Sequence, residues 1–586
     1  MTKSLFLVLP STLLAACASA GPPPPEKPSI PELLQGIRER AGRVLAQDPY
    51  GDGATRLVYL DQGWGPPETV WYYHADQGSV FMPYDTLLHL EQADSDQPFV
   101  APEHLARFRF LGQHRTPNNP DALPIGFTRH DDRVGLTCAA CHTAQINYRG
   151  TAMRIDGAPA LLDMDGFFRA IQAALAATLA DDAKLARFAT APAKGSDKGG
   201  AKDGDESARR EAARASLTET LRWFESYNTA NHSTVAEGFG RTDAIGRIFN
   251  QVIRFTSGPE NSLERNAPTS FPFLWDAPRH DYVQWTGFSS NADAGSIGRN
   301  AGEVIGVFGR VEVKHYETEA EAKQGYRSTI AGDNLVAMEE TLGRLKSPRW
   351  PGEILPPIDR QLAARGEALY RTECLSCHAA IDRDDPRRKV TAIITGTDVV
   401  GTDDRSARNI VEARVPTGVL RGAISPEGAR YGDQASPLEL LVDLVSRSLS
   451  AQPVPTLKAI ASAKLHGQKK TAKQGNHPQR TDASPLADVM AYKARPLNGI
   501  WATAPYLHNG SVPTLHDLLL PAGERPRTFA VGRMEYDPRK VGYVSDGQGP
   551  FVVDTSVPGN SNRGHEYGAQ LSDGDRWALV EYLKTL

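Results

Sequence analysis

The chain has little cysteine and methionine for its length, and it lacks a strong excess of charge of either sign. Only five cysteines and seven methionines occur among 586 residues. The 65 basic and 70 acidic side chains leave a net charge of -5. Because no strongly basic block stands out, the composition argues against a nucleic-acid binder. Beyond the N-terminus no run of about 18 apolar residues occurs, so no transmembrane helix is predicted.

Four of the five cysteines form two copies of one motif. The first copy reads CAACH at residues 138–142, and the second reads CLSCH at residues 374–378. Two thiols at this spacing lie on one side of a helical turn, where they can add to the two vinyl groups of a haem. The histidine that follows is then placed under the iron as proximal ligand. The spacing predicts two covalent haem c groups held by Cys138, Cys141, His142, Cys374, Cys377 and His378.

Two other chemistries use the same cysteine spacing. A single C-x-x-C can be a redox dithiol, and two copies can combine into a four-cysteine zinc site. An all-thiolate zinc site has no use for a histidine directly after the second cysteine, yet both copies carry one. The pattern therefore favours haem over zinc or a dithiol.

The N-terminus predicts export. Lys3 precedes an apolar segment at residues 5–14, which is too short to remain as a membrane-spanning helix. The sequence LAAC ending at Cys17 resembles a bacterial lipobox, in which the cysteine becomes the lipidated first residue. The alternative is ordinary secretion with cleavage near residues 18–20. We expect a protein of the periplasm or cell exterior, anchored by lipid alone, with a Pro-rich tether at residues 21–29.

Length and patterning predict two haem domains. The N-terminal domain is expected at residues 30–350 with a polar insert at 191–215, and the C-terminal domain at residues 351–586 with a polar insert at 463–484. The predicted fold is mainly α, with two cytochrome c-like domains, long irregular loops and minor β structure. The helix before the second motif resembles the first helix of a class I cytochrome c domain, and this resemblance implies that it pairs with a C-terminal helix. Residues 572–586 supply such a helix, with Ser572 as its N-cap.

Two further histidines lie in loops rich in Gly, Pro or Asn. His508 occurs in APYLHNGS and His565 in GNSNRGHEYG. Loops of this kind often carry binding residues. Both histidines are therefore candidate haem contacts.

Four stretches together resemble the di-haem proteins that include bacterial cytochrome c peroxidases, MauG-like enzymes and rubber oxygenases. They read GLTCAACHTAQINYRG, RIDGAPA, KARPLNGIWATAPYLHNGSVPTLHDLL and GNSNRGHEYG. The likeness extends over residues 61–586 without the two polar inserts, and it is greatest to the rubber-oxygenase-like members. The resemblance implies one reactive haem, which binds peroxide or dioxygen, and one six-coordinate haem, which transfers electrons.

The resemblance also implies how the two haems are ligated. In rubber oxygenases the N-terminal haem is the reactive one and the C-terminal haem has two histidine ligands, whereas peroxidases use Met and MauG uses Tyr as the sixth ligand. We therefore expect His565 to be the sixth ligand of the C-terminal haem. His508 is expected to lie close to this haem, as an outer contact or a propionate partner, and Met534 remains a rival ligand.

The open face of the N-terminal haem is expected under the aromatic loop at residues 266–288. Trp275, Trp285 and Phe288 are the candidate lining residues, although each could instead pack in the core. Glu264 or His280 could serve as an acid–base group, but a surface position is favoured for His280. Calcium is a further ion that the resemblance allows, without a compact acidic loop to hold it.

These observations predict an exported di-haem c-type oxidoreductase that activates peroxide or dioxygen at the N-terminal haem. The alternatives are a non-catalytic di-haem electron carrier and a zinc-stabilised binding protein. The expected partners are peroxide or dioxygen, a redox protein or small electron donor, and a hydrophobic organic substrate. Neither nucleic acid nor any membrane contact beyond the lipid anchor is expected.

Overall fold

The computed structural model describes residues 39–191 and 205–586. The predicted signal segment, Cys17 and the tether at residues 21–29 lie outside the described residues. No helix in the described ranges has the length and apolar character needed to cross a bilayer.

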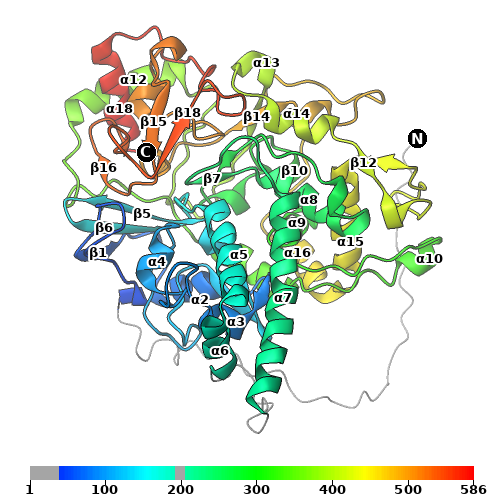
Figure 1. The fold of residues 1–586 in the computed structure, drawn as a ribbon. Coiled ribbons are helices and arrows are strands. Elements are labelled where there is room, and N and C mark those ends of the chain that lie inside the picture. The colour runs from blue at the N-terminus through cyan, green and yellow to red at the C-terminus, as the bar shows by residue number, and fades with distance from the viewer. Residues whose placement is uncertain (1–38, 192–204) are drawn as a thin grey trace.

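Helices form much of the described chain (Figure 1). In order they are α2 (Pro66–His74), α3 (Tyr84–His89), α4 (Pro102–Ala106), α5 (Met164–Ala180), α6 (Asp182–Thr190), α7 (Glu206–Ala230), α8 (Ala244–Thr256), α9 (Gly295–Gly306), α10 (Glu319–Ala322), α11 (Gly332–Leu342), α12 (Arg360–Glu373), α13 (Thr397–Val400), α14 (Arg405–Glu412), α15 (Pro437–Ser450), α16 (Pro453–Leu465), α17 (Leu515–Leu518) and α18 (Asp573–Leu583).

Strands are short and spread along the chain. They are β1 (Arg56–Tyr59), β2 (Met82–Pro83), β3 (Phe127–His130), β4 (Arg133–Leu136), β5 (Thr143–Tyr148), β6 (Thr151–Asp156), β7 (Arg241–Thr242), β8 (Thr269–Ser270), β9 (Tyr282–Val283), β10 (Ser289–Ser290), β11 (Ile393–Gly396), β12 (Val415–Pro416), β13 (Gln434–Ala435), β14 (Ala491–Ala494), β15 (Thr528–Val531), β16 (Tyr536–Asp537), β17 (Gly542–Tyr543) and β18 (Phe551–Asp554). They pair into several sheets of two or three strands.

The fold-class prediction was wrong. The structure is mixed α/β, with 38% helix and 14% strand, rather than mainly α with two cytochrome c-like domains. The clearest reason lies directly after the first motif, where β5 and β6 form an antiparallel hairpin to which β1 adds in parallel. Arg149 and Gly150 join the two strands with φ of 48° and 77°. A two-residue turn with both φ values positive follows the right-handed strand twist and closes a hairpin.

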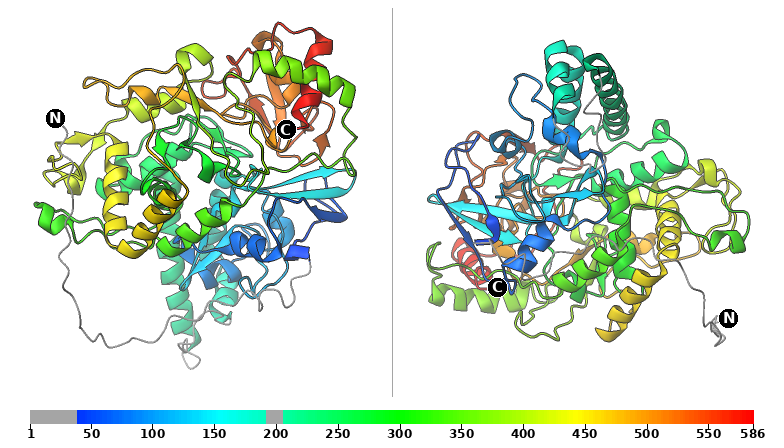
Figure 2. Two further views of the ribbon diagram at one scale, coloured as in Figure 1. Left: turned by 180° about the vertical axis from the view of Figure 1, so that it is seen from behind. Right: turned by 90° about the horizontal axis from the view of Figure 1, so that it is seen from below.

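The predicted pairing of helices around the second motif is confirmed. α12 and α18 lie side by side although they are far apart in sequence (Figures 1 and 2). The approach is close at Gly366, where an added Cβ would lie 2.0 Å from the carbonyl oxygen of Ala578. Ser572 caps α18 by accepting a hydrogen bond from the Asp575 amide at 3.2 Å.

The hydrophobic core joins residues from both sides of position 350. One cluster includes Trp64 and Ile155 together with Trp501 and Leu579. Another joins α8 and α9 to α15, which lie together in both Figure 1 and Figure 2. The two halves therefore pack as neighbours, and the division into domains at 350 stays a prediction. The polar insert at 191–215 is partly helical, since α7 begins at Glu206.

Candidate functional site

Each CxxCH motif folds into one tight turn. The His142 amide donates to the Cys138 carbonyl at 3.0 Å, and the His378 amide donates to the Cys374 carbonyl at 2.8 Å. These bonds bring the two thiols and the imidazole of each motif to one side of the turn. The first motif lines one cavity, here called the N-terminal cavity, and the second lines another, here called the C-terminal cavity.

A buried tyrosine on a helix earlier in the chain supports each turn. Tyr72 of α2 donates its hydroxyl proton to the His142 carbonyl at 3.0 Å, and Tyr370 of α12 does the same for the His378 carbonyl at 2.7 Å. Both tyrosines are almost fully buried. The two sites are thus built alike, since in each a tyrosine on a helix donates a hydrogen bond to the carbonyl of the motif histidine. The sequence analysis did not find this role of Tyr72, because α2 lies in a stretch without clear helical periodicity.

Two histidines face one another across the C-terminal cavity. The ring centres of His378 and His565 are 6.1 Å apart. A metal–imidazole bond is about 2 Å long, so two such bonds and the two ring radii span roughly this distance. The Nδ1 of His378 contacts the Arg495 carbonyl at 2.7 Å, which leaves its Nε2 for a metal. Burial lowers the pKa of His378 and lowers that of His565 to about 3, so both rings are neutral, as metal ligands must be.

The rival candidates take other places. His508 lines the C-terminal cavity and stacks on Tyr492 with ring centres 4.0 Å apart. Met534 is buried but does not line this cavity, and its carbonyl accepts a hydrogen bond from the Asn147 amide at 2.8 Å. The geometry therefore brings His565, and not Met534, opposite His378.

The N-terminal cavity is built differently. The Nδ1 of His142 contacts the Pro272 carbonyl at 2.7 Å, just as His378 contacts a carbonyl in the other site. Burial lowers the pKa of His142 to about 4. Among the described residues that line this cavity, His142 is the only histidine. Apolar side chains dominate the rest of the lining, among them Phe271, Phe273, Ile248, Phe288, Val307, Leu335, Met338 and Leu342.

The three predicted aromatic residues divide between cavity and core. Phe288 lines the N-terminal cavity, and Trp285 lines both cavities and donates its Nε1 proton to the Ser270 carbonyl at 2.9 Å. Trp275 lines neither cavity. It is fully buried, is stacked on Phe273, and donates to the Asn498 carbonyl at 2.9 Å. Its assignment to the open face is therefore corrected to a core position.

The two acid–base candidates also need correction. Glu264 bonds to the Thr234 hydroxyl and lines neither cavity. His280, for which a surface position was favoured, is 0% exposed, and both of its ring nitrogens lack a hydrogen-bond partner. Burial lowers its pKa well below the ordinary value, and nearby Lys493 and Arg495 lower it further.

The two cysteine pairs do not combine into one site, because they line separate cavities. Burial raises the pKa of the Cys138 and Cys374 thiols to about 12, which disfavours the thiolate that zinc requires. Within residues 39–191 and 205–586, no group of three or more His, Cys, Asp or Glu side chains is arranged to hold a metal ion. Calcium therefore has no support from the described residues.

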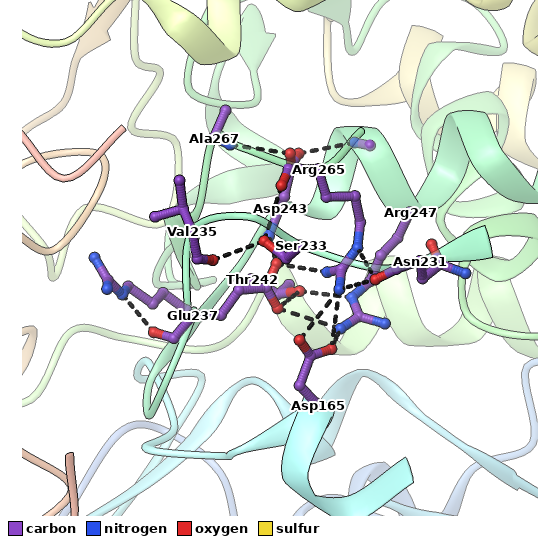
Figure 3. Close-up of polar contacts among 12 residues, drawn as sticks. Asp165, Asn231, Ser233, Val235, Glu237, Thr242, Asp243, Arg247, Arg265 and Ala267 are labelled. Atoms are coloured by element: carbon purple, nitrogen blue, oxygen red, sulfur yellow. Dashed lines mark hydrogen bonds and ion pairs between the residues drawn. The ribbon is translucent and has the colours of Figure 1, made fainter. Parts of the chain in front are cut away.

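A balanced ion network lies beside the N-terminal cavity (Figure 3). Arg247 lines the cavity and pairs with Asp165 and Glu237, and Arg265 pairs with the same two carboxylates, at 2.5 Å in the case of Glu237. All four side chains are at most 9% exposed. Removing one partner from such a buried group is costly, because it leaves an uncompensated charge. Sequence patterns did not indicate this network.

Comparison with known proteins places the chain in a family. The chain is 33% identical over 597 aligned residues to the "Uncharacterized protein y4iJ" of Sinorhizobium fredii (strain NBRC 101917 / NGR234), covering 91% of this chain and 93% of the relative. This chain belongs to the y4iJ family. The "Uncharacterized protein y4iM" of the same organism is 32% identical over 264 residues, which cover 39% of this chain and 51% of y4iM.

A second match relates this member of the y4iJ family to cytochromes. Residues 491–530 match the family described as "RoxA-like, cytochrome c-like". The matched segment includes Arg495, which bonds to His378, and His508, which lines the C-terminal cavity. The chain is therefore related to the cytochrome c superfamily. The printed names of the two relatives state no activity.

Proposed function

We propose that the chain is a di-haem c-type oxidoreductase that activates peroxide or dioxygen in the N-terminal cavity and transfers electrons through the C-terminal cavity. The observation that carries this proposal is the difference between the two cavities. One has two histidines 6.1 Å apart, and the other has a single histidine and an apolar lining. A haem iron reacts with a small oxidant only where an axial position is free.

The residues present fit two haem c groups. Each cavity offers two thiols and one imidazole from a single turn, and each proximal imidazole is oriented by a hydrogen bond to a carbonyl. When bound, the haem supplies an iron that exchanges electrons and binds peroxide or dioxygen. Around it, Phe271, Phe273 and Phe288 exclude water, and Trp285 lies in the wall that both cavities share.

A hydrophobic organic substrate is supported by a groove that meets the N-terminal cavity. This groove has a volume of about 960 Å³, and Ile245, Ile248 and Phe288 line both it and the cavity. Its far side is formed by Leu441 and Val445 of α15. Charged side chains also line the groove, among them Lys470, Lys473, Arg480 and Asp488, so it is amphipathic, and its apolar side would contact a bulky apolar molecule.

The electron paramagnetic resonance spectrum of the oxidised protein tests the proposal. We expect one low-spin ferric signal from the haem between His378 and His565 and one high-spin signal from the haem on His142. Two low-spin signals would instead indicate a pure electron carrier. The carrier has one observation in its favour, since the thioethers of Met164 and Met338 line the N-terminal cavity and either could act as a sixth ligand. An optical spectrum without a Soret band would exclude haem altogether.

Replacing Phe288 with alanine should open the face of the reactive haem. We expect faster binding of carbon monoxide or cyanide to the high-spin haem, by several-fold, with the low-spin signal unchanged. Trp275→Phe is the matched control, because Trp275 is an aromatic residue of the same loop that lines neither cavity. Stopped-flow absorbance measures the binding. Ligand binding confined to the His378 haem would mean that the two haems have exchanged roles.

The predicted membrane anchor is also part of the proposal, although Cys17 lies outside the described residues. Acylated Cys17 would hold the protein on a membrane that faces the periplasm or the cell exterior, because several acyl chains bind firmly together. Cys17→Ser should therefore move the protein into the soluble fraction or stall its processing. Cell fractionation and N-terminal mass analysis measure this. A soluble wild-type protein whose chain begins after Ala20 would contradict the anchor and favour simple secretion.

A further inference from the structure

Two buried cations lie in the wall between the cavities. Lys493 of β14 and the adjoining Arg495 line both the N-terminal and the C-terminal cavity. Both residues are 7% exposed. His280, fully buried and without a partner for either ring nitrogen, is close enough for both cations to lower its pKa. The wall therefore concentrates positive charge and hydrogen-bond donors away from water.

In the described chain, backbone carbonyl oxygens rather than carboxylates accept the hydrogen bonds of these cations. Lys493 Nζ donates to the Tyr282 carbonyl at 3.2 Å, and Arg495 Nη2 donates to the Phe273 carbonyl at 2.6 Å. Arg495 Nε has no partner. Within the described parts of the chain neither side chain forms an ion pair.

The carboxylates whose charge acts on these two cations are engaged elsewhere. Asp276 pairs with Arg388 at 2.5 Å. Asp281 accepts hydrogen bonds from the amides of Tyr282 and Ala392 at 2.8 and 2.9 Å. Asp276 raises the pKa of Arg495, and Asp281 raises the pKa of Lys493. In both cases burial, which lowers the pKa of the cation, has the larger effect.

This arrangement contrasts with the network in Figure 3, which borders the same cavity. There two arginines meet two carboxylates, so the charges cancel. A buried charge without a partner is unfavourable, and an arginine side chain does not escape this cost by losing its proton. The wall is therefore complementary to a ligand that carries a negatively charged group.

We propose that Lys493 and Arg495 form a carboxylate-binding site that takes the propionate groups of the haem attached at residues 138–142. The inference rests on the proposed function, because that haem is the ligand. It deepens that function by stating how the haem would be oriented. Its propionate groups would point toward the wall that the two cavities share.

The N-terminal haem is chosen over the other because of a third cation. Arg299 lines the N-terminal cavity and not the C-terminal one, and its charge acts on both Lys493 and His280. Arg299 itself is paired with Glu339 at 2.6 Å. Glu303, a carboxylate in the lining of the same cavity, accepts a hydrogen bond from Gln284 at 2.7 Å. Three cations thus line the N-terminal side of the wall, and of these Lys493 and Arg495 form no ion pair.

Substitution of Lys493 tests the site. In the full-length wild-type protein we expect a resonance Raman band of propionate bending that reports hydrogen-bonded carboxylates. Lys493→Met should shift that band and lower the midpoint potential of the high-spin haem, because a nearby positive charge favours the added electron. A tenfold change in the one-electron equilibrium constant corresponds to about 59 mV, and we expect a shift of this order. Lys493→Arg should restore both values.

A second buried lysine provides the control. Lys184 is 8% exposed, bonds to the carbonyls of Gln92 and Ser95, pairs with Glu91 at 3.4 Å and lines neither cavity. Lys184→Met removes the same group and should leave the Raman band and both potentials unchanged. An unshifted propionate band in Lys493→Met, or a potential change confined to the low-spin haem, would overturn the inference while two covalent haems remained. A wild-type protein without covalent haem would instead overturn the proposed function.

Discussion

Replacing His565 with alanine is expected to turn the haem on His378 from a low-spin into a high-spin centre. The two imidazoles lie 6.1 Å apart across the C-terminal cavity, and no other histidine faces His378 as closely in the described chain. Loss of one strong nitrogen ligand leaves an open axial position, which weakens the ligand field and admits external ligands. Electron paramagnetic resonance should then show two high-spin signals and no low-spin signal.

The same variant should also slow electron delivery, since its iron reorganises its ligands on each change of oxidation state. His508→Ala is the matched control, because His508 lines the same cavity but stacks on Tyr492. It should keep the low-spin signal. If the low-spin signal survived in His565→Ala and vanished in His508→Ala or Met534→Leu, the ligand assignment would be wrong.

Removing the cysteines of one motif should remove one haem entirely. The variant with alanine at Cys138 and Cys141 should retain half of the covalent haem, and so should the variant with alanine at Cys374 and Cys377. The thioether bonds are the link between haem and chain that survives denaturation. Haem staining of a denaturing gel therefore measures how much covalent haem each variant retains.

The spectra of the two double variants should differ, which makes this experiment a test of the roles as well as of the number of haems. Loss of the first pair should leave only the low-spin signal, and loss of the second pair only the high-spin signal. Circular dichroism checks that each variant is folded. Unchanged haem stain in either variant would refute covalent attachment at that motif.

Local patterns predicted the features that depend on a few neighbouring residues. The spacing within residues 138–142 and 374–378 is sufficient to set the turn, because its closing hydrogen bond joins the motif's own backbone. The start of α5 is likewise local, since the Asp163 side chain caps it by accepting a hydrogen bond from the Gly166 amide. The pairing of α12 with α18 was expected because the helix before the second motif resembles the first helix of a cytochrome c domain, and it is observed.

Patterns failed where several distant segments decide the environment of a side chain. His280 adjoins Arg279 and Asp281 in sequence, which suggested a surface, yet residues as distant as Lys493 and Arg495 enclose it. Trp275 and Phe288 lie in one aromatic loop, but only Phe288 reaches a cavity, because the carbonyl of Asn498 holds Trp275 in the core. The hairpin of β5 and β6 was missed because its turn has no Asn-Gly or Asp-Gly signal.

The sequence by itself determined the local geometry of the two motifs, since two thiols and an imidazole within five residues are placed by one turn of backbone. Only the tertiary structure decided the difference between the two sites. It brings His565 opposite His378, surrounds His142 with apolar side chains, and leaves Lys493 and Arg495 in the shared wall without a carboxylate. The physical reason is that coordination, dielectric environment and charge balance depend on which groups are neighbours in space. Long-range packing alone determines which residues become neighbours.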